Sequence, residues 1–310
     1  MFAALLRKTA PPGITGIGVD TEGIAITQLL HAQGRRPSLL AGEYIAYGDK
    51  GALNTLIHAV AKKYRLHKAY CSSVLEGGDY KLLLTEAPDV PDDELPAAMR
   101  WRVKDLIDTP IADITLDVIK VPSAAADQRN AVYVVTARNG VIRQHIDLLK
   151  EANVNLQVID IAEMAQRNIA ALLPQDKTGV AMLSLRPHHS LITMTRDGEL
   201  YLSRTLIVGL EAINDPEQQE DAFNKIALEI QRSLDYYESN CRQPPIRQLA
   251  LLPLPSEAEK FVEYLRQNLS IEVSIVDLNE LVDNEIELPQ DLQAKIFVSF
   301  GAALRERAAA

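Results

Sequence analysis

The sequence predicts an α/β fold built from two related halves, with a smaller α/β module inserted in the first half. The main observation is a weak internal repeat of three consecutive strands, which begins near residue 14 and again near residue 180. Each set of three strands is followed by an amphipathic helix and a further apolar strand. We expect the halves at residues 1–178 and 179–310, and the module at about residues 88–152.

In the first half, strands are expected at Ile14–Asp20, Ile24–His31 and Gly42–Tyr47, because short apolar runs there are separated by turn residues. A helix is expected at about Ala52–Tyr64 and a strand at Lys68–Leu75. After the module, a strand and a helix close this half. They are expected at Val154–Ile161 and Ala162–Leu173, before a linker at Pro174–Thr178.

The module begins after a segment rich in Pro and Asp, which predicts a break in regular structure. Its expected elements are a helix at Glu94–Ile107, strands at Ile114–Val121 and Ala131–Arg138 around the loop Ser123–Asn130, and a helix at Val141–Ala152.

The second half repeats the pattern of the first. Its expected strands are Val180–Leu185, Ser190–Thr195 and Leu200–Val208, with a hairpin turn at Asp197-Gly198. A helix through Phe223 and Tyr237, the strand Gln248–Leu252, and a helix capped by Ser256–Glu259 follow. Three strands that lead into a helix and a further strand form a ribonuclease-H-like unit. Two such units predict the duplicated actin-like architecture.

Composition and charge exclude several classes of function. A formal net charge of −10 and a pI near 5.2 disfavour nucleic acid, whose binding depends on clustered Lys and Arg. The two cysteines, Cys71 and Cys241, form neither a disulfide framework nor a metal set, which fits a reducing compartment. No stretch reaches the roughly 20 apolar residues needed to cross a bilayer. The apolar start, Met1–Leu6, precedes its positive charges, unlike a secretory signal.

Five strings resemble, in the correct order, those of the PilM-like family of type IV pilus proteins, in the FtsA and PilM branch of the actin fold. The strings are Ala97–Asp117, Val158–Ile161 with the following helix, Leu202–Arg204, Ile226–Tyr237 and Phe300–Arg305. Trp101 followed by Asp105 and Leu106 is similar to the branch that serves MSHA pili. The resemblance implies an actin-like fold with an FtsA/PilM-type insertion subdomain in the first half.

The loops that hold nucleotide in this fold are altered. The family's first turn reads roughly Gly-x-Asp-x-Gly-Ser, with an aspartate that organises metal and water. Here Asp20 is retained, but Glu22 stands at the glycine position, where its carboxylate would face phosphate. The second turn falls at Ser184–Pro187 without the aspartate or glycine, and Leu252–Pro255 replaces the adenosine-contacting glycines.

We therefore expect no catalytic residue, no cofactor and no metal site. If nucleotide is bound after all, the candidates are Asp20, Thr21, Glu22 and Gly23, and ATP with Mg²⁺ stays a disfavoured ligand. The alternative interpretation of Asp20 is a hairpin-turn aspartate. The adjacent His188 and His189 have no ligand partner at metal-binding spacing, so they are expected on a solvated loop.

Trp101 is expected to point away from the core face of its helix, because Leu95, Met99, Val103 and Leu106 share the opposite face. Either it anchors a partner or it packs on the neighbouring subdomain. The resemblance implies a partner, since PilM-like proteins bind the cytoplasmic N-terminal peptide of PilN between the first-half core and the insertion. The residues expected near that groove are Arg100, Trp101, Lys104 and Ile107.

The leading hypothesis is a non-catalytic, cytoplasmic scaffold of an MSHA-like pilus assembly platform. It would bind a PilN-like bitopic inner-membrane protein and convey contact with the assembly ATPase or the platform protein. It would bind no nucleic acid, and it would reach the inner membrane through its partner without inserting. Two alternatives stay open: a nucleotide-binding ATPase of the PilM type, and a cytoplasmic module like that of the type II secretion protein GspL.

Overall fold

The computed structural model describes residues 13–31, 35–48, 52–122, 130–255, 258–284 and 286–305. The apolar start Met1–Leu6, most of the loop Ser123–Asn130 and the expected capping residues Ser256 and Glu257 lie outside the described residues. Within the described residues, no helix is both long enough and apolar enough to span a bilayer.

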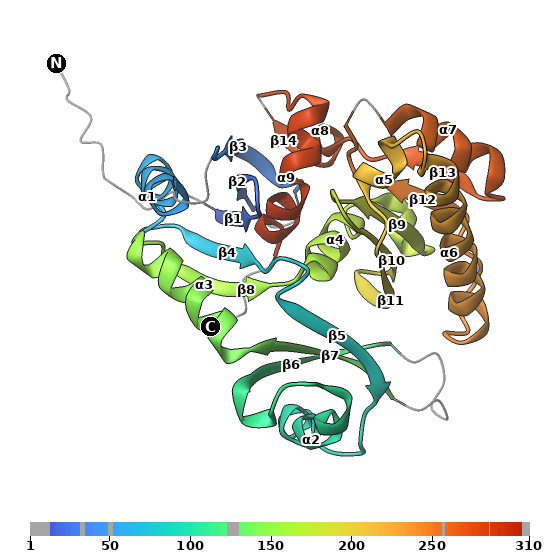
Figure 1. Cartoon of the computed structure of the whole chain (residues 1–310), viewed down its shortest axis with the longest axis horizontal. Coiled ribbons are helices and arrows are strands. Elements are labelled where there is room, and N and C mark those ends of the chain that lie inside the picture. The colour runs from blue at the N-terminus through green and yellow to red at the C-terminus, as the bar shows by residue number, and fades with distance from the viewer. Residues whose placement is uncertain are drawn as a thin grey trace.

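A six-stranded sheet forms the centre of the first half, in the order β14-β3-β2-β1-β4-β8 (Figure 1). Strands β1, β2 and β3 are antiparallel, whereas β4 and β8 run parallel to β1 and to each other. Helices α1 and α3 cover its outer face with apolar side chains. The bounds are β1 Ile14–Val19, β2 Gly23–Leu30, β3 Ser38–Ala46, α1 Leu53–Lys63, β4 Tyr70–Val74, α3 Asn139–Glu151 and β8 Leu156–Asp160.

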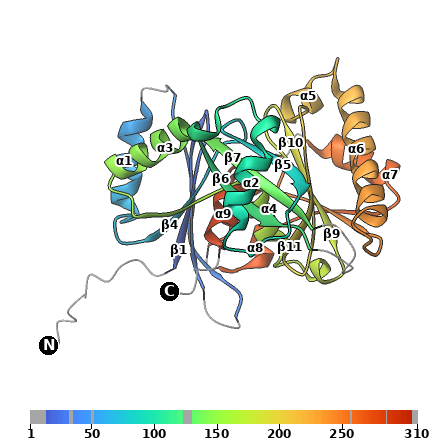
Figure 2. The same ribbon diagram turned by 90° about the horizontal axis from the view of Figure 1, so that it is seen from below.

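The second half repeats this arrangement in a five-stranded sheet of order β11-β10-β9-β12-β13. Again three antiparallel strands are followed by strands parallel to the first of them. Helices α6 and α7 pack on the outer face (Figure 2). The bounds are β9 Val180–Leu185, β10 Ser190–Arg196, β11 Glu199–Leu206, α5 Leu210–Asn214, α6 Gln219–Ser239, β12 Gln248–Leu251, α7 Glu259–Asn268 and β13 Glu272–Ile275.

The insertion is a three-stranded antiparallel sheet of order β5-β7-β6 with helix α2 on one face. Its first strand, β5, was not expected from the sequence. Because of it, this sheet begins at Tyr80, ahead of the expected start near residue 88. The expected long helix is also interrupted, since α2 ends at Arg102 and a short 3₁₀ turn follows at Lys104–Leu106. The bounds are β5 Tyr80–Glu86, α2 Leu95–Arg102, β6 Ile114–Lys120 and β7 Ala131–Arg138.

The end of the chain returns to the first half. After α8 (Leu278–Leu281), the short strand β14 (Asp283–Asn284) pairs with β3, and α9 (Gln290–Ala303) packs between the two sheets beside α4 (Ala162–Ala170). Glycines permit this close packing. A Cβ on Gly16 would lie 1.8 Å from the Ser299 carbonyl oxygen of α9, and a Cβ on Gly301 would lie 2.2 Å from the Ala165 carbonyl oxygen of α4. The two halves therefore share one central core.

Candidate functional site

A cavity of about 400 Å³ lies between the two halves, where the turns that follow β1 and β9 approach each other. Its walls come from residues 18–22, 74–77 and 184–189, and from one face of α9 at residues 291–298. More apolar than polar surface lines this cleft. It occupies the place where actin-fold enzymes hold nucleotide between two turns.

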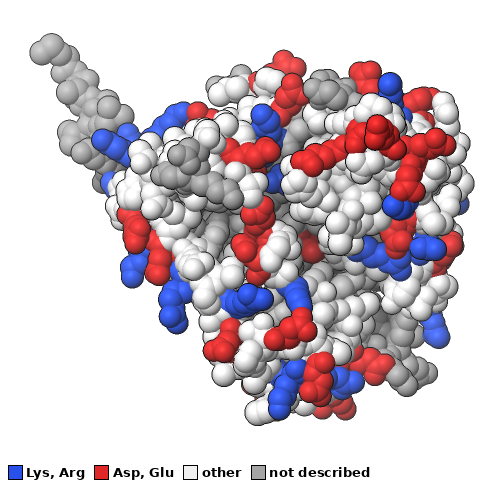
Figure 3. Space-filling model, viewed as in Figure 1, with Lys and Arg blue, Asp and Glu red and all other residues white. Residues whose placement is uncertain are grey.

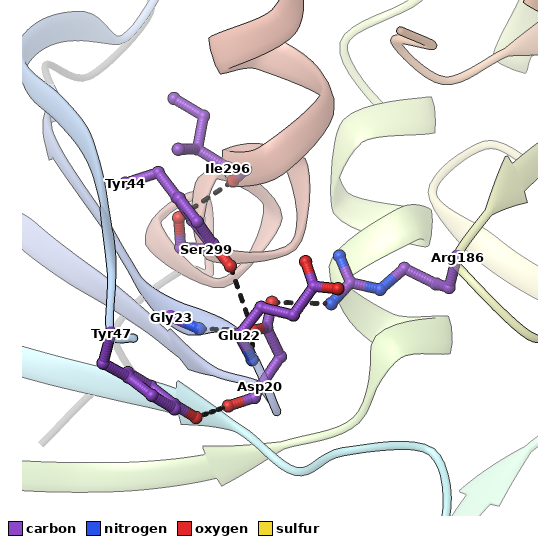
Figure 4. Close-up of polar contacts among 8 residues, drawn as sticks. All are labelled: Asp20, Glu22, Gly23, Tyr44, Tyr47, Arg186, Ile296 and Ser299. Carbon is purple, nitrogen blue, oxygen red and sulfur yellow. Dashed lines mark hydrogen bonds and ion pairs between the residues drawn. The ribbon is translucent and has the colours of Figure 1, made fainter. Parts of the chain in front are cut away.

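Asp20 organises the first turn through its carboxylate. Oδ1 accepts hydrogen bonds from the backbone N–H groups of Glu22 and Gly23, both at 2.8 Å, and from the Tyr44 hydroxyl at 3.1 Å. The Tyr47 hydroxyl donates to the backbone oxygen of Asp20 (Figure 4). Burial, and after it the charge of Asp20, raises the pKa of Tyr44, which keeps this hydroxyl a donor.

Arg186 closes the cleft from the other half. Its Nη2 donates to Asp20 Oδ2 at 3.0 Å, and both side chains are mostly shielded, at 23% and 19% exposure (Figure 4). Its guanidinium also lies 5.8 Å from the centre of the Phe297 ring on α9. Both carboxylate oxygens of Asp20 thus already have hydrogen-bond partners, and the guanidinium of Arg186 places a positive charge inside the cleft.

The turn that carries Arg186 is held by the segment after β11. The backbone N–H of Leu210 donates to the Arg186 carbonyl oxygen at 2.8 Å, and that of Glu211 donates to the Pro187 carbonyl oxygen at 3.0 Å. A Cβ on Gly209 would lie 2.2 Å from the Arg186 carbonyl oxygen, so a glycine is needed at this contact. The second turn has a fixed shape, and Pro187 brings no N–H to it.

The two adjacent histidines of this turn differ in their surroundings. His188 is exposed and pairs with Glu211 at 3.1 Å, as expected for a solvated loop. His189 is half-buried in the cleft wall, so the expectation was wrong for this residue. Burial, then the charges of Arg186 and His188, lowers the pKa of His189. No group of three or more His, Cys, Asp or Glu among the described residues is arranged to hold a metal ion.

Of the remaining candidates of the first turn, Thr21 and Glu22 line the cleft and Gly23 does not. Thr21 and Glu22 are exposed, and Gly23 is buried at the start of β2. The backbone N–H groups of Glu22 and Gly23 both donate to Asp20, so neither is free to bind a phosphate oxygen. In the third altered loop, Leu252 and Leu254 are buried and Pro255 lines the cleft.

A second cavity, of about 550 Å³, adjoins the cleft and lies between the insertion and the second half. We call it the groove. Residues 80–84 of β5 and residues 202–205 of β11 form its long walls, and Tyr133 of β7 also lines it. The Ser203 N–H donates to the Tyr133 hydroxyl across it at 2.9 Å. Gly77, Ala162, His189 and Leu191 line both cavities, so the groove leads into the cleft.

Glu163, at the start of α4, is a buried acid that lines the groove and was missed by sequence reasoning. Its side chain is 3% exposed, and the Tyr80 hydroxyl donates to Oε2 at 2.6 Å. Burial is the largest influence on this carboxyl and raises its pKa. From the sequence, a single Glu in an amphipathic helix is expected to lie on the solvent-exposed face, so nothing indicated that Glu163 is buried. Its contact with Tyr80 depends on β5, the strand that the sequence pattern did not indicate.

The four expected partner-binding residues lie on the far side of the insertion sheet from the groove, and none lines the groove. Trp101 is 71% exposed, so the alternative in which it packs on the neighbouring subdomain is wrong. Arg100 donates to the carbonyl oxygens of Ile111 and Ile114, at 2.8 and 3.2 Å. Lys104 is exposed and Ile107 is half-buried.

The core face of α2 is also shorter than expected. Leu95, Met99 and Val103 are buried as predicted, but Leu106 is 55% exposed. The 3₁₀ turn that begins at Lys104 changes the spacing, so Leu106 no longer falls on the face of the preceding helix. Trp101 and Leu106 are therefore both exposed apolar residues on the outer side of the insertion.

Comparisons with known proteins agree with this architecture. The family model described as type IV pilus assembly protein PilM matches residues 49–220, more than half of the chain. A search of curated protein sequences found no match to this chain. A solved PilM–PilN type IV pilus biogenesis complex aligns with a TM-score of 0.74 and 19% identity, covering 94% of this chain and 97% of that chain.

Two further solved structures show weaker likeness. A Bacteroides thetaiotaomicron protein with an actin-like ATPase fold and unknown function has a TM-score of 0.52 at 11% identity, over 92% of this chain and 96% of that one. The cytoplasmic domain of EpsL, from the type II secretion system of Vibrio cholerae, has a TM-score of 0.48 at 14% identity, over 91% and 92%. The first two structural matches confirm the predicted actin-like fold. Because the family model covers more than half of its length, this chain belongs to the family of the type IV pilus assembly protein PilM.

Proposed function

We propose that this chain is a non-catalytic scaffold of a type IV pilus assembly platform, and that the platform is of the MSHA type served by MshI-like proteins. Membership of the PilM family supports the place in pilus assembly. Trp101 followed by Asp105 and Leu106 supports the MSHA branch. The protein acts in the cytoplasm and is held at the inner membrane by its partner.

The contact between Asp20 and Arg186 carries the non-catalytic part of this proposal. An actin-fold ATPase needs the aspartate of its first turn to organise a metal ion and water. In this chain Oδ1 of Asp20 accepts hydrogen bonds from the turn's backbone and from the Tyr44 hydroxyl, and Oδ2 is paired with Arg186 at 3.0 Å. Metal-assisted hydrolysis would first require the loss of that ion pair.

Two features of the cleft surface also oppose phosphate binding. The Glu22 carboxylate lies on the turn that should approach the phosphates, and Pro187 has no N–H to offer. Charged side chains of both signs are interspersed over the face that Figure 3 shows, with no broad basic area there. These features support a protein that works through binding surfaces.

Calorimetric titration with ATP and Mg²⁺, together with a thermal-shift assay, tests this part. We expect no heat of binding and no stabilisation at millimolar nucleotide. The matched variant combines Glu22→Gly with Arg186→Gly, which removes the facing carboxylate and releases Asp20. A gain of nucleotide binding in that variant alone would identify these two residues as the block. Mg²⁺-dependent binding by the wild type would instead restore the PilM-type ATPase as the leading function.

The proposed partner is the cytoplasmic N-terminal segment of a PilN-like inner-membrane protein. The family and the likeness to a PilM–PilN complex support this choice. The groove supports an extended segment, because β11 is the edge strand of its sheet and apolar residues of β5 face it. Through this attachment the scaffold conveys contact with the assembly ATPase or the platform protein.

Two surfaces are candidates for docking this N-terminal segment, which we call the tail. One is the groove, and the other is the outer face of the insertion with Arg100, Trp101, Lys104 and Ile107. A pull-down with the partner's tail separates them. Leu84→Asp changes the groove, where Leu84 is 43% exposed, and Trp101→Ala changes the outer face. Ile275→Ala, at the end of β13, serves as the control. Loss of binding in one of the first two variants, with the thermal melt unchanged, assigns the surface.

A further inference from the structure

Glu163 is a buried acid on the groove wall that has no cationic partner. Its Oε2 accepts from the Tyr80 hydroxyl at 2.6 Å, and no Lys or Arg among the described residues forms an ion pair with it. A buried carboxylate is costly unless it is paired or hydrogen-bonded to several donors. The groove therefore presents an acid whose ionised form is incompletely compensated.

The cations nearest to the groove are already engaged. Lys81 has an exposed side chain that pairs with Asp108 at 2.7 Å. Arg204 of β11 pairs with Glu229, and its guanidinium lies 5.6 Å from the centre of the Tyr236 ring. Neither of these two charges is free to neutralise Glu163.

The other polar groups around Glu163 do not supply a positive charge either. Asp160, at the end of β8, adds a negative charge, although Arg305 pairs with it at 2.7 Å. The Tyr133 hydroxyl accepts from Ser203, and burial together with nearby Arg186 and His188 lowers the pKa of His189. Every titratable group that faces Glu163 is thus neutral, acidic or paired.

The rest of the groove selects an extended, largely apolar occupant. Leu82 and Leu84 lie on the same side of β5 as Tyr80, because side chains alternate along a strand. On the opposite wall, β11 has one edge without a strand partner, and residues 202–205 line the groove consecutively. A segment in β conformation meets apolar side chains on one side and backbone groups on the other.

We propose that the groove binds an extended apolar segment that carries one positively charged residue, and that this charge pairs with the carboxylate of Glu163. The inference rests on the proposed docking of a cytoplasmic tail and names the chemistry that the tail must have. The occupant is the PilN-like tail; a neutral apolar tail would leave Glu163 unpaired.

Proton linkage follows from this pairing. Burial raises the pKa of Glu163 in the free protein, whereas a bound cation favours the ionised form. At a pH near or below the pKa of Glu163 in the free protein, binding of the charged tail therefore releases protons, and the affinity falls as the pH is lowered through that pKa. A tail without the positive charge shows neither effect.

The experiment titrates synthetic peptides of the tail into the wild type and Glu163→Gln by calorimetry. The peptides are the natural sequence and versions in which one Lys or Arg at a time is replaced by Gln. We expect one replacement to weaken binding to the wild type by about tenfold or more, equivalent to ~1.4 kcal/mol, and to change binding to Glu163→Gln little. Glu263→Gln, on the exposed side of α7, is the control and behaves as the wild type.

The outcomes separate this inference from the proposed function. If the wild type binds the tail but each charge replacement costs the same in both proteins, the pairing with Glu163 is overturned and the docking function stands. If the wild type binds no tail, both fall. Should Glu163→Gln fail to fold, proton release by the wild type, measured in two buffers of different ionisation enthalpy at a series of pH values from 4.5 upwards, decides: the absence of release at every pH overturns the pairing.

Discussion

Arg186 and Asp20 are 166 positions apart in the sequence, yet their side chains form an ion pair of 3.0 Å across the cleft between the two halves. The pair joins the two turns that would flank the phosphates in an actin-fold enzyme. It connects the halves at the cleft, while α9 connects them in the core. The contribution of this ion pair to the free energy of unfolding can be measured.

Substitution of Arg186 by Gln should destabilise the protein by about 1–3 kcal/mol, because it leaves the mostly buried carboxylate of Asp20 without its charged donor. Urea unfolding followed by circular dichroism measures the loss. A double-mutant cycle with Asp20→Asn isolates the interaction between the two side chains. Lys225→Gln, which removes an exposed pair on α6, should cost only about 0.3–0.5 kcal/mol. A coupling energy near zero would show that this ion pair contributes nothing to holding the halves together.

Gly301→Ala should cost about 1–3 kcal/mol or more. The new Cβ would lie 2.2 Å from the Ala165 carbonyl oxygen, so α9 and α4 must move apart and lose packing. The matched control is Gly140→Ala in α3, where a Cβ meets nothing within 4 Å. That change should stabilise the protein by about 0.5–1 kcal/mol, since Ala favours helix more than Gly does. Equal melting temperatures for the two variants would contradict the close contact between α9 and α4.

Trp101→Ala should change the free energy of unfolding by less than about 0.5 kcal/mol, because the side chain is 71% exposed. Met99→Ala, two residues earlier in α2, should cost about 2–5 kcal/mol, because Met99 is fully buried. Thermal or urea unfolding of the two variants checks this contrast. A large loss for Trp101→Ala would mean that the indole is buried in solution.

Glu163→Gln should raise stability at neutral pH. Burial raises the pKa of Glu163 in the folded state above its ordinary value of 4.5, so folding favours the protonated form. The stability that this group contributes is complete below the unfolded pKa and is lost as the pH rises through the folded pKa. The melting temperature of Glu163→Gln should therefore exceed that of the wild type at pH 7–8, and the gap should narrow towards pH 4.5. A gap of the same size at every pH would contradict the raised pKa.

Both thiols should react slowly with a disulfide reagent at pH 8 in the folded protein. Burial raises the pKa of Cys71 to about 12 and that of Cys241 to about 11, so little thiolate is present. Cys71 is also inaccessible, while Cys241 is partly exposed. In urea both should react quickly. Rapid labelling of Cys71 before unfolding would reveal an opening of the first sheet.

Most of the fold follows from local patterns. The three-strand repeat places β1–β3 and β9–β11 within a few residues of their observed bounds, and β9 agrees at both ends, Val180 and Leu185. Strand β5 was missed because its residues, Tyr80–Glu86, contain one apolar run without clear alternation, and its partner β7 lies about fifty residues later. The return of α9 to the first sheet was also not predicted, because no local signal indicates which sheet a helix will cover.

The features of the candidate site also fall into two groups, those that local sequence predicts and those that depend on the folded structure. The altered phosphate-binding turns and the retained Asp20 could be predicted from local sequence, because each is a matter of which residue stands in a recognisable turn. Three features appear only in the folded chain: Arg186 pairs with Asp20, Glu163 lines the groove, and Trp101 lies away from the groove. Each of these depends on residues brought together from distant parts of the chain. Such contacts arise from packing of the halves and the insertion, which local periodicity does not encode.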